Sequence, residues 1–515
     1  MGSQHSTLHA PTLAGPDTTL DGSDRANRRP ALTILWHPDV RRIGERALLG
    51  TRRIELSRIE PIFEPSGVAE GAPLADQYIS HRTPAALLGL AGEGVELSPG
   101  DGDAPIKLDG SPLLDRVLLS PGALETGVIL TVARRVVLCL HYARTARPPA
   151  VDTLGLVGVS DAISEIRADI RRVAPARTPV LIRGETGTGK ELVALAFRAA
   201  GGRAPAPFIA VNMAKIPRDR AVAEIFGYEK GAFTGSIAAY SGAFRAAHGG
   251  TLFLDELGLT PMEVQVVLLR VLEDGLVQSL GSAKEHKVDV RLIAATDADL
   301  NKAMADGSFS PALFERLARY PITLPPLRER REDIGVLLRH LLRLHLAAHG
   351  EPDRLAQPPT AAPWLSASAV AKLALYDWPH NVRQLSNSAE RIVIDNLGQQ
   401  KAELSKRVRD DLQDRSPVKL EAPTGPPSDE QVAEAFKRHQ GNLRLAAAEL
   451  GISRTHFYEA RKRNRYLPQL STISDEDLLA SHAANGGDIV RTARDLAVPV
   501  KALQDRLARL LPKRR

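Results

Sequence analysis

The stretch TPVLIRGETGTGKELVALAF, at residues 178–197, decides the fold of the central part of this chain. Its apolar run Val180–Ile182 predicts a strand, and GETGTGKE at 184–191 joins that strand to a helical pattern. The spacing G-x-x-x-x-G-K is that of a P-loop, in which glycines let backbone N–H groups turn towards phosphate oxygens at the positive end of the following helix. Glu191 stands where Ser or Thr is usual. The residues expected to bind the phosphates are Gly184, Glu185, Thr186, Gly187, Thr188, Gly189, Lys190 and Glu191.

A second stretch, GGTLFLDEL at 249–257, predicts a buried parallel strand that ends in two carboxylates. Ligands of open α/β sheets lie at the carboxyl ends of the strands. Asp255 therefore suits a Mg²⁺ ion, and Glu256 suits the polarisation of an attacking water. Together with the P-loop, this strand end predicts an ATPase of the AAA+ type that uses ATP and Mg²⁺.

The rest of the chain divides around this core. At about 150 residues per domain, 515 residues predict three or four domains. The fold class that we expect is multidomain: an N-terminal all-β sandwich-like domain, a central α/β P-loop domain with a helical lid, and a C-terminal all-α tandem helix-turn-helix. The expected boundaries are a disordered leader at 1–30, the β domain at 31–143, a linker at 144–152, the α/β subdomain at 153–330, the lid at 331–400, a linker at 401–427 and helix-turn-helix units at 428–467 and 474–511.

Composition excludes several classes of protein. Hydrophobic residues make up 43% of the chain and charged residues 25%, as in globular proteins. A single cysteine, Cys139, excludes a disulfide framework and a cysteine-based zinc site, and its place in an apolar run predicts a buried thiol. The sequence contains no apolar stretch of membrane-helix length and no signal peptide, so we expect a cytoplasmic protein without a membrane partner.

The C-terminal part carries an internal repeat and a positive charge. The segments that begin at Ser428 and Ser474 align without a gap, and residues 428–515 hold 16 Lys and Arg against 11 Asp and Glu. In the first copy, GNLRLAAAELGISRTHFYEARKR at 441–463 predicts two helices around a turn, and the second helix suits a DNA major groove. We expect double-stranded DNA as the partner and an auxiliary or dimerising role for the second copy. The candidate DNA-binding residues are Arg454, Thr455, His456, Tyr458, Arg461 and Lys462.

The loop GYEKGAFTGS at 227–236 resembles the GAFTGA loop of the bacterial enhancer-binding proteins, the AAA+ activators of sigma-54 RNA polymerase. The central region from about 153 to 395 is similar to their AAA+ domain throughout, and residues 441–463 resemble their Fis-type helix-turn-helix. Other matching stretches are VNM (211–213), RVLEDG (270–275), VDVRLIAAT (288–296), LPPLRERREDI (324–334) and YDWPHNVRQL (376–385).

This resemblance implies roles for individual residues. Asn212 would couple Glu256 to the nucleotide state, Arg316 would act as an arginine finger in a neighbouring subunit, and Arg383 would sense the γ-phosphate from the lid. A finger of this kind implies a ring homo-oligomer, in this family a hexamer. The residues implied to contact the sigma factor, Phe233 and Thr234 above all, are Gly231, Ala232, Phe233, Thr234, Gly235 and Ser236.

The chain departs from the family pattern at three positions. Ser310 stands where an arginine is usual, Ser236 replaces the final alanine of the loop, and Asp297 replaces an asparagine. A carboxylate near the γ-phosphate repels it unless it is turned away or protonated. Two alternatives to a sigma-54 activator therefore stay open: a nucleotide-binding, DNA-bound regulator with impaired hydrolysis, and an AAA+ remodeller of a different client.

The N-terminal β domain resembles, in short stretches only, the forkhead-associated fold, a phosphothreonine-binding β-sandwich. The stretches are Arg42–Gly44, IELSR at 54–58, Tyr78–Ser80 and LDG at 108–110. The resemblance implies that Arg46, Ser80 and Arg82 clamp a phosphate group of a protein signal. A β domain that only contacts another protein is the alternative.

Overall fold

The computed structural model describes residues 27–413 except for 66–69, 80–84, 91–93, 101–104, 147–152, 203–204, 235, 357, 359 and 361, and in the C-terminal part it describes 429–438, 457, 460–461, 463–464, 467, 473–489, 491–492, 496, 498 and 500–510. The chain forms two compact units, residues 1–414 and 415–515, which are treated separately below. In the part of the chain that the structure describes, no helix has the length and apolar character needed to cross a membrane.

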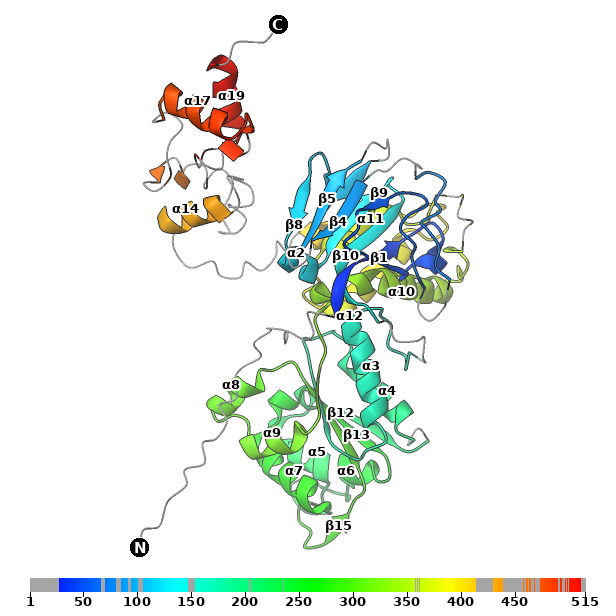
Figure 1. The fold of residues 1–515 in the computed structure, drawn as a ribbon. Helices are drawn as coiled ribbons and strands as arrows, with labels where there is room; N and C mark the ends of the chain where they lie inside the picture. Colours follow the sequence, from blue (N-terminus) through cyan, green and yellow to red (C-terminus); the bar gives the residue numbers. More distant parts are fainter. Residues whose placement is uncertain are drawn as a thin grey trace, which may run out of the picture. The chain divides into compact units, whose positions relative to one another are not determined.

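A five-stranded parallel sheet forms the core of the α/β region and confirms the predicted α/β class of this region. The predicted P-loop strand, β11, lies inside the sheet between β16 and β17, and the acidic strand, β13, lies between β12 and β16. Helices cover both faces of this sheet (Figure 1), which explains why its strands are continuous apolar runs without polar alternation. The strands are β11 (Val180–Arg183), β12 (Phe208–Asn212), β13 (Thr251–Asp255), β16 (Arg291–Thr296) and β17 (Pro321–Thr323). The helices are α3 (Asp161–Val173), α4 (Lys190–Ala200), α5 (Ala221–Phe226), α6 (Gly242–Ala246), α7 (Met262–Asp274), α8 (Leu300–Ala305) and α9 (Pro311–Leu317), and a hairpin is formed by β14 (Leu276–Gln278) and β15 (Glu285–Lys287).

The lid is a helical layer that follows the sheet in sequence. Its helices are α10 (Ile334–Ala348), α11 (Ala367–Leu375), α12 (Asn381–Asp395) and α13 (Lys406–Gln413). The last of them falls within residues 401–427, which we predicted to be a linker. That boundary is wrong, because Val408 of α13 is 1% exposed and belongs to the lid core.

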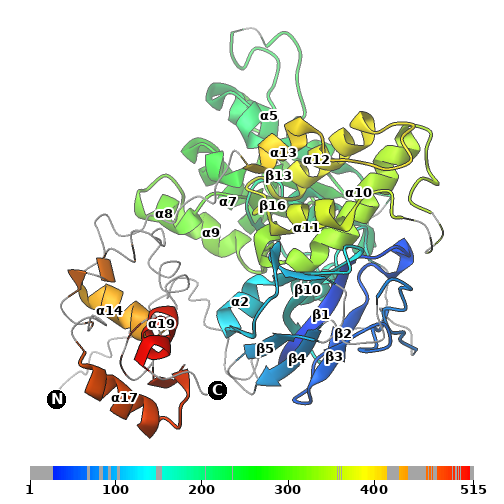
Figure 2. The same cartoon turned by 90° about the horizontal axis from the view of Figure 1, so that it is seen from above.

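Residues 28–144 form two antiparallel sheets that face each other across one apolar core (Figure 2). The first strand begins at Arg28, so the leader predicted to extend to residue 30 ends earlier. The larger sheet has the order β2-β1-β10-β9-β6-β7 and the smaller one β3-β4-β5-β8. The strands are β1 (Arg28–Trp36), β2 (Arg46–Leu48), β3 (Ile54–Leu56), β4 (Ala85–Leu90), β5 (Gly94–Pro99), β6 (Ile106–Leu108), β7 (Ser111–Pro112), β8 (Val117–Leu119), β9 (Val128–Val132) and β10 (Val136–Arg144), with a short helix α2 (Pro121–Thr126) before β9.

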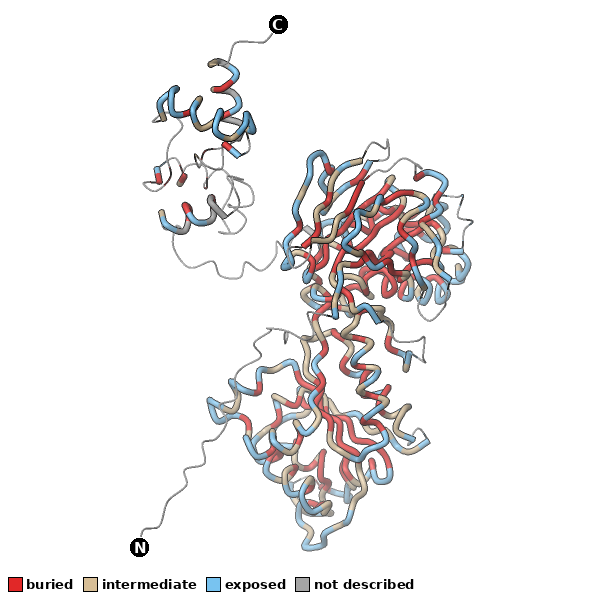
Figure 3. The backbone as a smooth tube through the Cα atoms, in the orientation of Figure 1, coloured by how far each residue is buried: buried red, intermediate tan, exposed pale blue. Residues whose placement is uncertain are grey.

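The central strands β1 and β10 of the larger sheet are largely buried on both faces. Alternate residues of β10 point to opposite sides: Leu138 and Leu140 belong to the core between the two sheets, whereas Val137 and Cys139 belong to the core of the lid. Figure 3 shows the resulting buried layer, in red, along these strands. The β domain and the lid therefore share one hydrophobic core, and the predicted burial of the Cys139 thiol is confirmed.

Among the residues that the structure describes in the C-terminal unit are the helices α14 (Asp429–Arg438), α17 (Asp475–Ala484) and α19 (Val500–Leu510). Leu478 of α17 and Leu503 and Leu507 of α19 lie in one buried cluster, as expected of a packing helix in the second repeat. Most of the second helix of the first repeat lies outside the described residues.

Candidate functional site

The loop between β11 and α4 has the backbone geometry that phosphate binding requires. Gly184, Gly187 and Gly189 have φ values of +156°, +81° and +107°, and the last of these is the N-cap of α4. A side chain at Gly187 would meet the lid, since its Cβ would lie 2.2 Å from the carbonyl oxygen of His380. Glycine is thus required at this position both for the backbone conformation and for the close approach of the lid.

Lys190 and Thr188 are held inside this loop. The Nζ atom of Lys190 donates hydrogen bonds to the carbonyl oxygens of Gly184 (2.8 Å) and Glu185 (3.3 Å), and the side chain is 7% exposed. The hydroxyl of Thr188 donates to the carbonyl oxygen of Glu185 at 2.8 Å. Glu191, in contrast, is exposed in the first turn of α4. The loop therefore encloses one positive charge at the N-terminus of α4, where phosphates bind.

The acidic residues lie at the neighbouring strand ends, as the sequence predicted. Asn212 and Asp255 are register partners at the ends of β12 and β13, and the amide Nδ2 of Asn212 donates to Asp255 at 3.1 Å. Glu256 follows with φ of +56°. The structure thus places the Asn212 amide on Asp255, and its predicted coupling to Glu256 stays a prediction.

Asp297 brings a third carboxylate to this edge. It accepts a hydrogen bond from the hydroxyl of Thr186 at 2.5 Å and is also hydrogen-bonded to Glu256. Burial, followed by the nearby charge of Asp297, raises the pKa of Glu256. Burial opposes the ionisation of Asp297, but the hydrogen bonds from Thr186 and Glu256 outweigh it and lower the pKa of Asp297. Any proton that this pair shares therefore resides on Glu256.

The lid closes over the P-loop through a residue that sequence analysis did not single out. Asn381, fully buried at the start of α12, donates from Nδ2 to Glu185 Oε2 and to the Thr186 carbonyl oxygen, both at 3.1 Å. Its Oδ1 accepts from the backbone N–H of Leu327 at 2.7 Å. Arg383, two residues on, donates its backbone N–H to Gly187 at 3.3 Å and carries an exposed side chain, which is compatible with the predicted sensor role.

Two arginines before the lid also reach the P-loop and were missed. Arg328 forms a bidentate pair with Glu185, with distances of 2.9 and 2.6 Å, and this pair lowers the pKa of Glu185. Arg330, 3% exposed, donates to the Thr188 carbonyl oxygen at 3.1 Å. The Glu185 carboxylate therefore accepts hydrogen bonds from Arg328 and from Asn381 of the lid, and these bonds turn it away from the place of a phosphate chain.

Arg316 lies on α9, and Ser310 is the residue that precedes this helix. The Arg316 guanidinium is 39% exposed and donates to Glu273 of α7 at 3.1 Å. Ser310 is the N-cap of α9, where its hydroxyl accepts from the backbone N–H of Leu313 at 3.4 Å. An N-capping role explains a serine at this position without any catalytic function.

The loop at 231–236 is folded back on itself by a serine. The Ser236 hydroxyl accepts from the backbone N–H of Phe233 at 3.1 Å and donates to the Phe233 carbonyl oxygen at 2.7 Å. The Phe233 ring makes an edge contact with Tyr228, with ring centroids 4.9 Å apart, yet Phe233 is 42% exposed. Gly231 and Thr234 are exposed and Ala232 is half-buried, whereas Gly235 lies outside the described residues. The loop thus presents an aromatic side chain to solvent.

The remaining candidates fall in the terminal domains. Arg46 is 7% exposed, and its guanidinium lies 3.5 Å from Asp161 and donates to the Arg144 carbonyl oxygen at 3.0 Å. This internal placement disfavours the predicted phosphate contact. Ser80 and Arg82 lie outside the described residues.

In the C-terminal unit only one predicted DNA-binding residue is described. Arg461 is 7% exposed, and its guanidinium lies 4.7 Å from the centre of the Phe436 ring, so the structure places it in the core of the unit and not on a DNA-facing surface. Burial and the cation–π contact account for this difference from the prediction. Arg454, Thr455, His456, Tyr458 and Lys462 lie outside the described residues.

Comparisons with known proteins agree with this geometry. Residues 156–323 match the family model "Sigma-54 interaction domain", and residues 328–419 match "AAA+ ATPase lid domain". The chain is 45% identical over 264 residues to the DNA-binding transcriptional regulator NtrC of Escherichia coli K12, covering 50% of this chain and 54% of that protein. It therefore spans about half the length of this relative.

Two further relatives are matched over a larger share of their length. The chain is 38% identical to NtrC of Azospirillum brasilense, over 70% of this chain and 70% of that protein. It is 35% identical to the C4-dicarboxylate transport transcriptional regulatory protein DctD of Pseudomonas aeruginosa, over 72% of this chain and 78% of that protein. The similarity thus extends beyond the nucleotide-binding region.

Proposed function

The chain belongs to the family of sigma-54-interacting AAA+ transcriptional regulators that includes NtrC and DctD, and from this premise we propose that it is a bacterial transcriptional activator that uses ATP hydrolysis to remodel sigma-54 RNA polymerase. The observation that carries this proposal is the combination, in one AAA+ domain, of a P-loop closed by its lid and an exposed Phe233 loop.

The residues at the sheet edge suit ATP with Mg²⁺. In the part of the chain that the structure describes, no cluster of three or more His, Cys, Asp or Glu could hold a metal by itself. Mg²⁺ is commonly bound by one or two carboxylates together with substrate phosphates, and Asp255 supplies such a carboxylate. The ion, when bound, neutralises charge on the β- and γ-phosphates. Lys190 holds the same phosphates, and Glu256 accepts a hydrogen bond from the attacking water.

Hydrolysis in this proposal needs a neighbouring subunit. The Arg316 side chain is half-exposed on α9 and forms an ion pair with Glu273 of its own chain, a partly exposed pair of small energetic weight. It is therefore able to exchange Glu273 for the γ-phosphate in an adjacent subunit, where a planar guanidinium stabilises transferred charge. We propose a ring homo-oligomer, with six subunits as in the family expectation, and a cytoplasmic location.

The terminal domains complete the proposal. The basic C-terminal repeats would bind double-stranded DNA at an enhancer-like site, with an affinity that falls steeply as salt rises. The N-terminal β domain would receive a phosphothreonine-containing or other protein signal.

The sigma-54 contact is tested by co-purification with sigma-54 in the presence of an ATP transition-state mimic. Phe233→Ala removes the exposed ring and should abolish the complex, because a central aromatic anchor dominates an interface of this kind. Ile237→Ala is the matched control, since Ile237 is 84% exposed four residues away. A complex that survives Phe233→Ala, or that never forms with the parent chain, contradicts the assignment of this loop.

A nucleotide-bound regulator with slow hydrolysis is the second candidate, and one observation favours it. The Asp297 carboxylate is hydrogen-bonded to both Glu256 and Thr186. A Glu256 side chain engaged in this way has to be released before it can orient a water. ATP binding with very slow turnover by the parent chain would favour this reading.

A further inference from the structure

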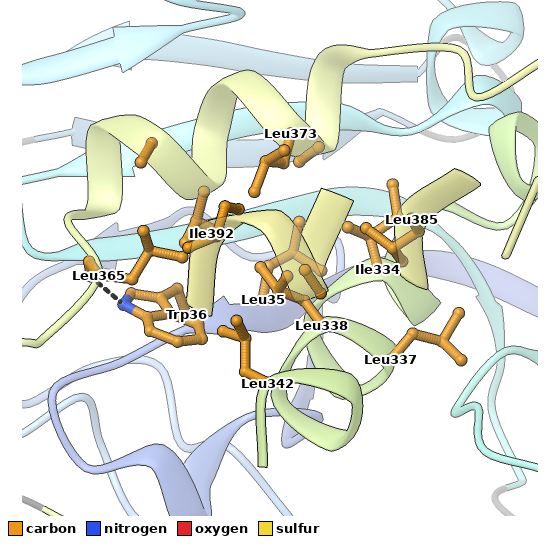
Figure 4. Packing of buried hydrophobic residues seen from close by; sticks show 14 of the residues in the cluster. Leu35, Trp36, Ile334, Leu337, Leu338, Leu342, Leu365, Leu373, Leu385 and Ile392 are labelled. Atoms are coloured by element: carbon orange, nitrogen blue, oxygen red, sulfur yellow. Dashed lines mark hydrogen bonds between the residues drawn. The ribbon is translucent and has the colours of Figure 1, made fainter. Parts of the chain in front are cut away.

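The β domain is attached to the lid by apolar packing that allows almost no clearance. A Cβ atom at Gly335 of α10 would lie 2.3 Å from the Leu35 carbonyl oxygen in β1. Beside this contact, the indole Nε1 of Trp36 donates to the Leu365 carbonyl oxygen at 3.0 Å (Figure 4). Leu35 and Trp36 are fully buried among lid leucines, so separating the two parts exposes a continuous apolar surface to water.

Arginine side chains from the AAA+ side fix the rim of this contact. Arg339 of α10 donates to the Val40 carbonyl oxygen at 2.8 Å. Arg331 donates to the Gly127 carbonyl oxygen of the β domain at 3.3 Å and pairs with Asp377 of the lid at 3.0 Å. These bonds place charged donors of the AAA+ side on backbone carbonyls of the β domain, which fixes the two parts in register at the rim of the apolar contact.

The same β domain is attached a second time, to the α/β subdomain. Asp161, the first residue of α3, accepts from the backbone N–H of Arg144 at 2.7 Å and lies 3.5 Å from the buried Arg46 guanidinium. Helix α3 belongs to the core of the α/β subdomain, whereas α10 belongs to the core of the lid. The β domain therefore contacts both of the parts that the segment between β17 and α10 connects.

From this second attachment a chain of polar contacts leads to the P-loop. Next to Asp161, the Ser160 hydroxyl donates to Asp333 at 2.8 Å, and Asp333 is fully buried. Asp333 in turn lies 3.7 Å from Arg330, which donates to the Thr188 carbonyl oxygen. A displacement of the β domain would therefore move Asp333 and Arg330, and Arg330 is hydrogen-bonded to the P-loop.

We propose that the β domain is a clamp across the joint between the α/β subdomain and the lid, which keeps the lid closed over the P-loop and so raises nucleotide affinity. Opening the lid requires either the apolar contact at Leu35 or the Asp161 contact to break, since the β domain holds both sides. A signal that detaches the β domain would thus loosen the nucleotide. The inference rests on the proposed nucleotide-binding function and specifies how that site is regulated.

Alanine substitutions of two glycines in the 515-residue chain test the clamp. Gly335→Ala inserts a methyl group against Leu35, while alanine favours the helix α10 itself by about 1 kcal/mol. Gly122→Ala in α2 is the matched control, because a Cβ there meets no atom closer than 4.0 Å. Circular dichroism verifies that both variants are folded.

Two measurements report the state of the clamp: the accessibility of Cys139 and the affinity for nucleotide. Cys139 is the single cysteine of the chain and lies in the shared core, so the rate at which the thiol reagent DTNB modifies it reports detachment. A fluorescent ATP analogue reports nucleotide affinity. We expect Gly335→Ala to accelerate modification and to weaken nucleotide binding by about fivefold or more, the usual lower range of coupling between sites, with Gly122→Ala unchanged.

The parent chain provides a test that does not depend on any variant. Because coupling is reciprocal, saturating nucleotide should slow the modification of Cys139 by a similar factor. Nucleotide that binds without protecting Cys139, or a Gly335→Ala chain with exposed Cys139 and unchanged affinity, overturns the clamp while leaving nucleotide binding intact. A parent chain that binds no ATP overturns the proposed function and the clamp together.

Discussion

Asn381 offers the sharpest test of how the lid is held over the P-loop. Asn381→Gly removes three hydrogen bonds, to the Leu327 N–H at 2.7 Å and to Glu185 and the Thr186 carbonyl oxygen at 3.1 Å. Glycine retains the backbone conformation, because Asn381 has φ of +54°. At about 0.5–1.5 kcal/mol for each bond, the three bonds together contribute roughly 1.5–4.5 kcal/mol to the closed lid.

This loss should appear as weaker nucleotide binding. A cost of about 2 kcal/mol corresponds to roughly a 30-fold rise in the dissociation constant of a fluorescent ATP analogue. Asn381→Ala should be worse by about 1–2 kcal/mol, because a Cβ atom is strained at positive φ. Asn387→Ala is the control, since Asn387 is exposed on the same helix.

The comparison among these variants decides the reasoning. Equal affinities for the parent chain and Asn381→Gly, measured on folded protein, would show that the lid bonds do not support the nucleotide site. Equal affinities for Asn381→Gly and Asn381→Ala would show that the strain argument is wrong, even if the hydrogen bonds matter.

Two further predictions concern carboxyl groups. Asp297→Asn removes the charge beside Glu256 and should lower the KM for ATP and raise kcat in steady-state kinetics; unchanged or lower values contradict the view that Asp297 slows this enzyme. Burial raises the pKa of Glu332 from 4.5 to about 8, so the folded chain holds a proton that the unfolded chain loses, and Tm should fall as pH rises from about 6.5 to 8. Burial lowers the pKa of His141 from 6.5 to about 4, so the folded chain loses stability as pH falls from about 6.5 to 4. Below about pH 6.5 this loss opposes the gain from Glu332, so the Glu332 effect on Tm is seen mainly above about pH 6.5. Glu332→Gln should therefore flatten the alkaline side of the Tm profile, and parallel profiles for the two chains would refute the assignment.

The nucleotide site could be predicted from the sequence because its residues lie in two short stretches. The P-loop from Gly184 to Lys190 and the strand end at Asp255 each carry their spacing within a few residues. The apolar run before each stretch predicts a parallel strand, so both stretches are expected at the carboxyl ends of the strands, on one edge of the sheet. The structure brings these two stretches together as adjacent elements of one parallel sheet.

The lid contacts could not be predicted in the same way. Asn381 is 196 residues from Glu185, and Arg328 is 143 residues from it, so no local pattern records either pair. Asn381 and Arg328 lay inside stretches used to establish the resemblance, but their roles depend on how the lid folds back. Only the three-dimensional structure supplies that information.

The packing of the β domain on the lid leaves a trace in the sequence, in the apolar run of β10. The run Val136–Leu140 has no polar residue, whereas a strand with one face in solvent alternates. Such a run predicts a strand buried on both faces. Sequence analysis took from it only the burial of Cys139, and the second buried face turned out to be the lid.

ATPase turnover measured against protein concentration tests the central claim most directly. The account predicts that turnover per chain rises cooperatively with concentration, because Arg316 acts in a neighbouring subunit, and that Arg316→Ala and Glu256→Gln each abolish it while nucleotide binding persists. Turnover that is independent of concentration, or that survives Arg316→Ala, would contradict a ring-forming ATPase.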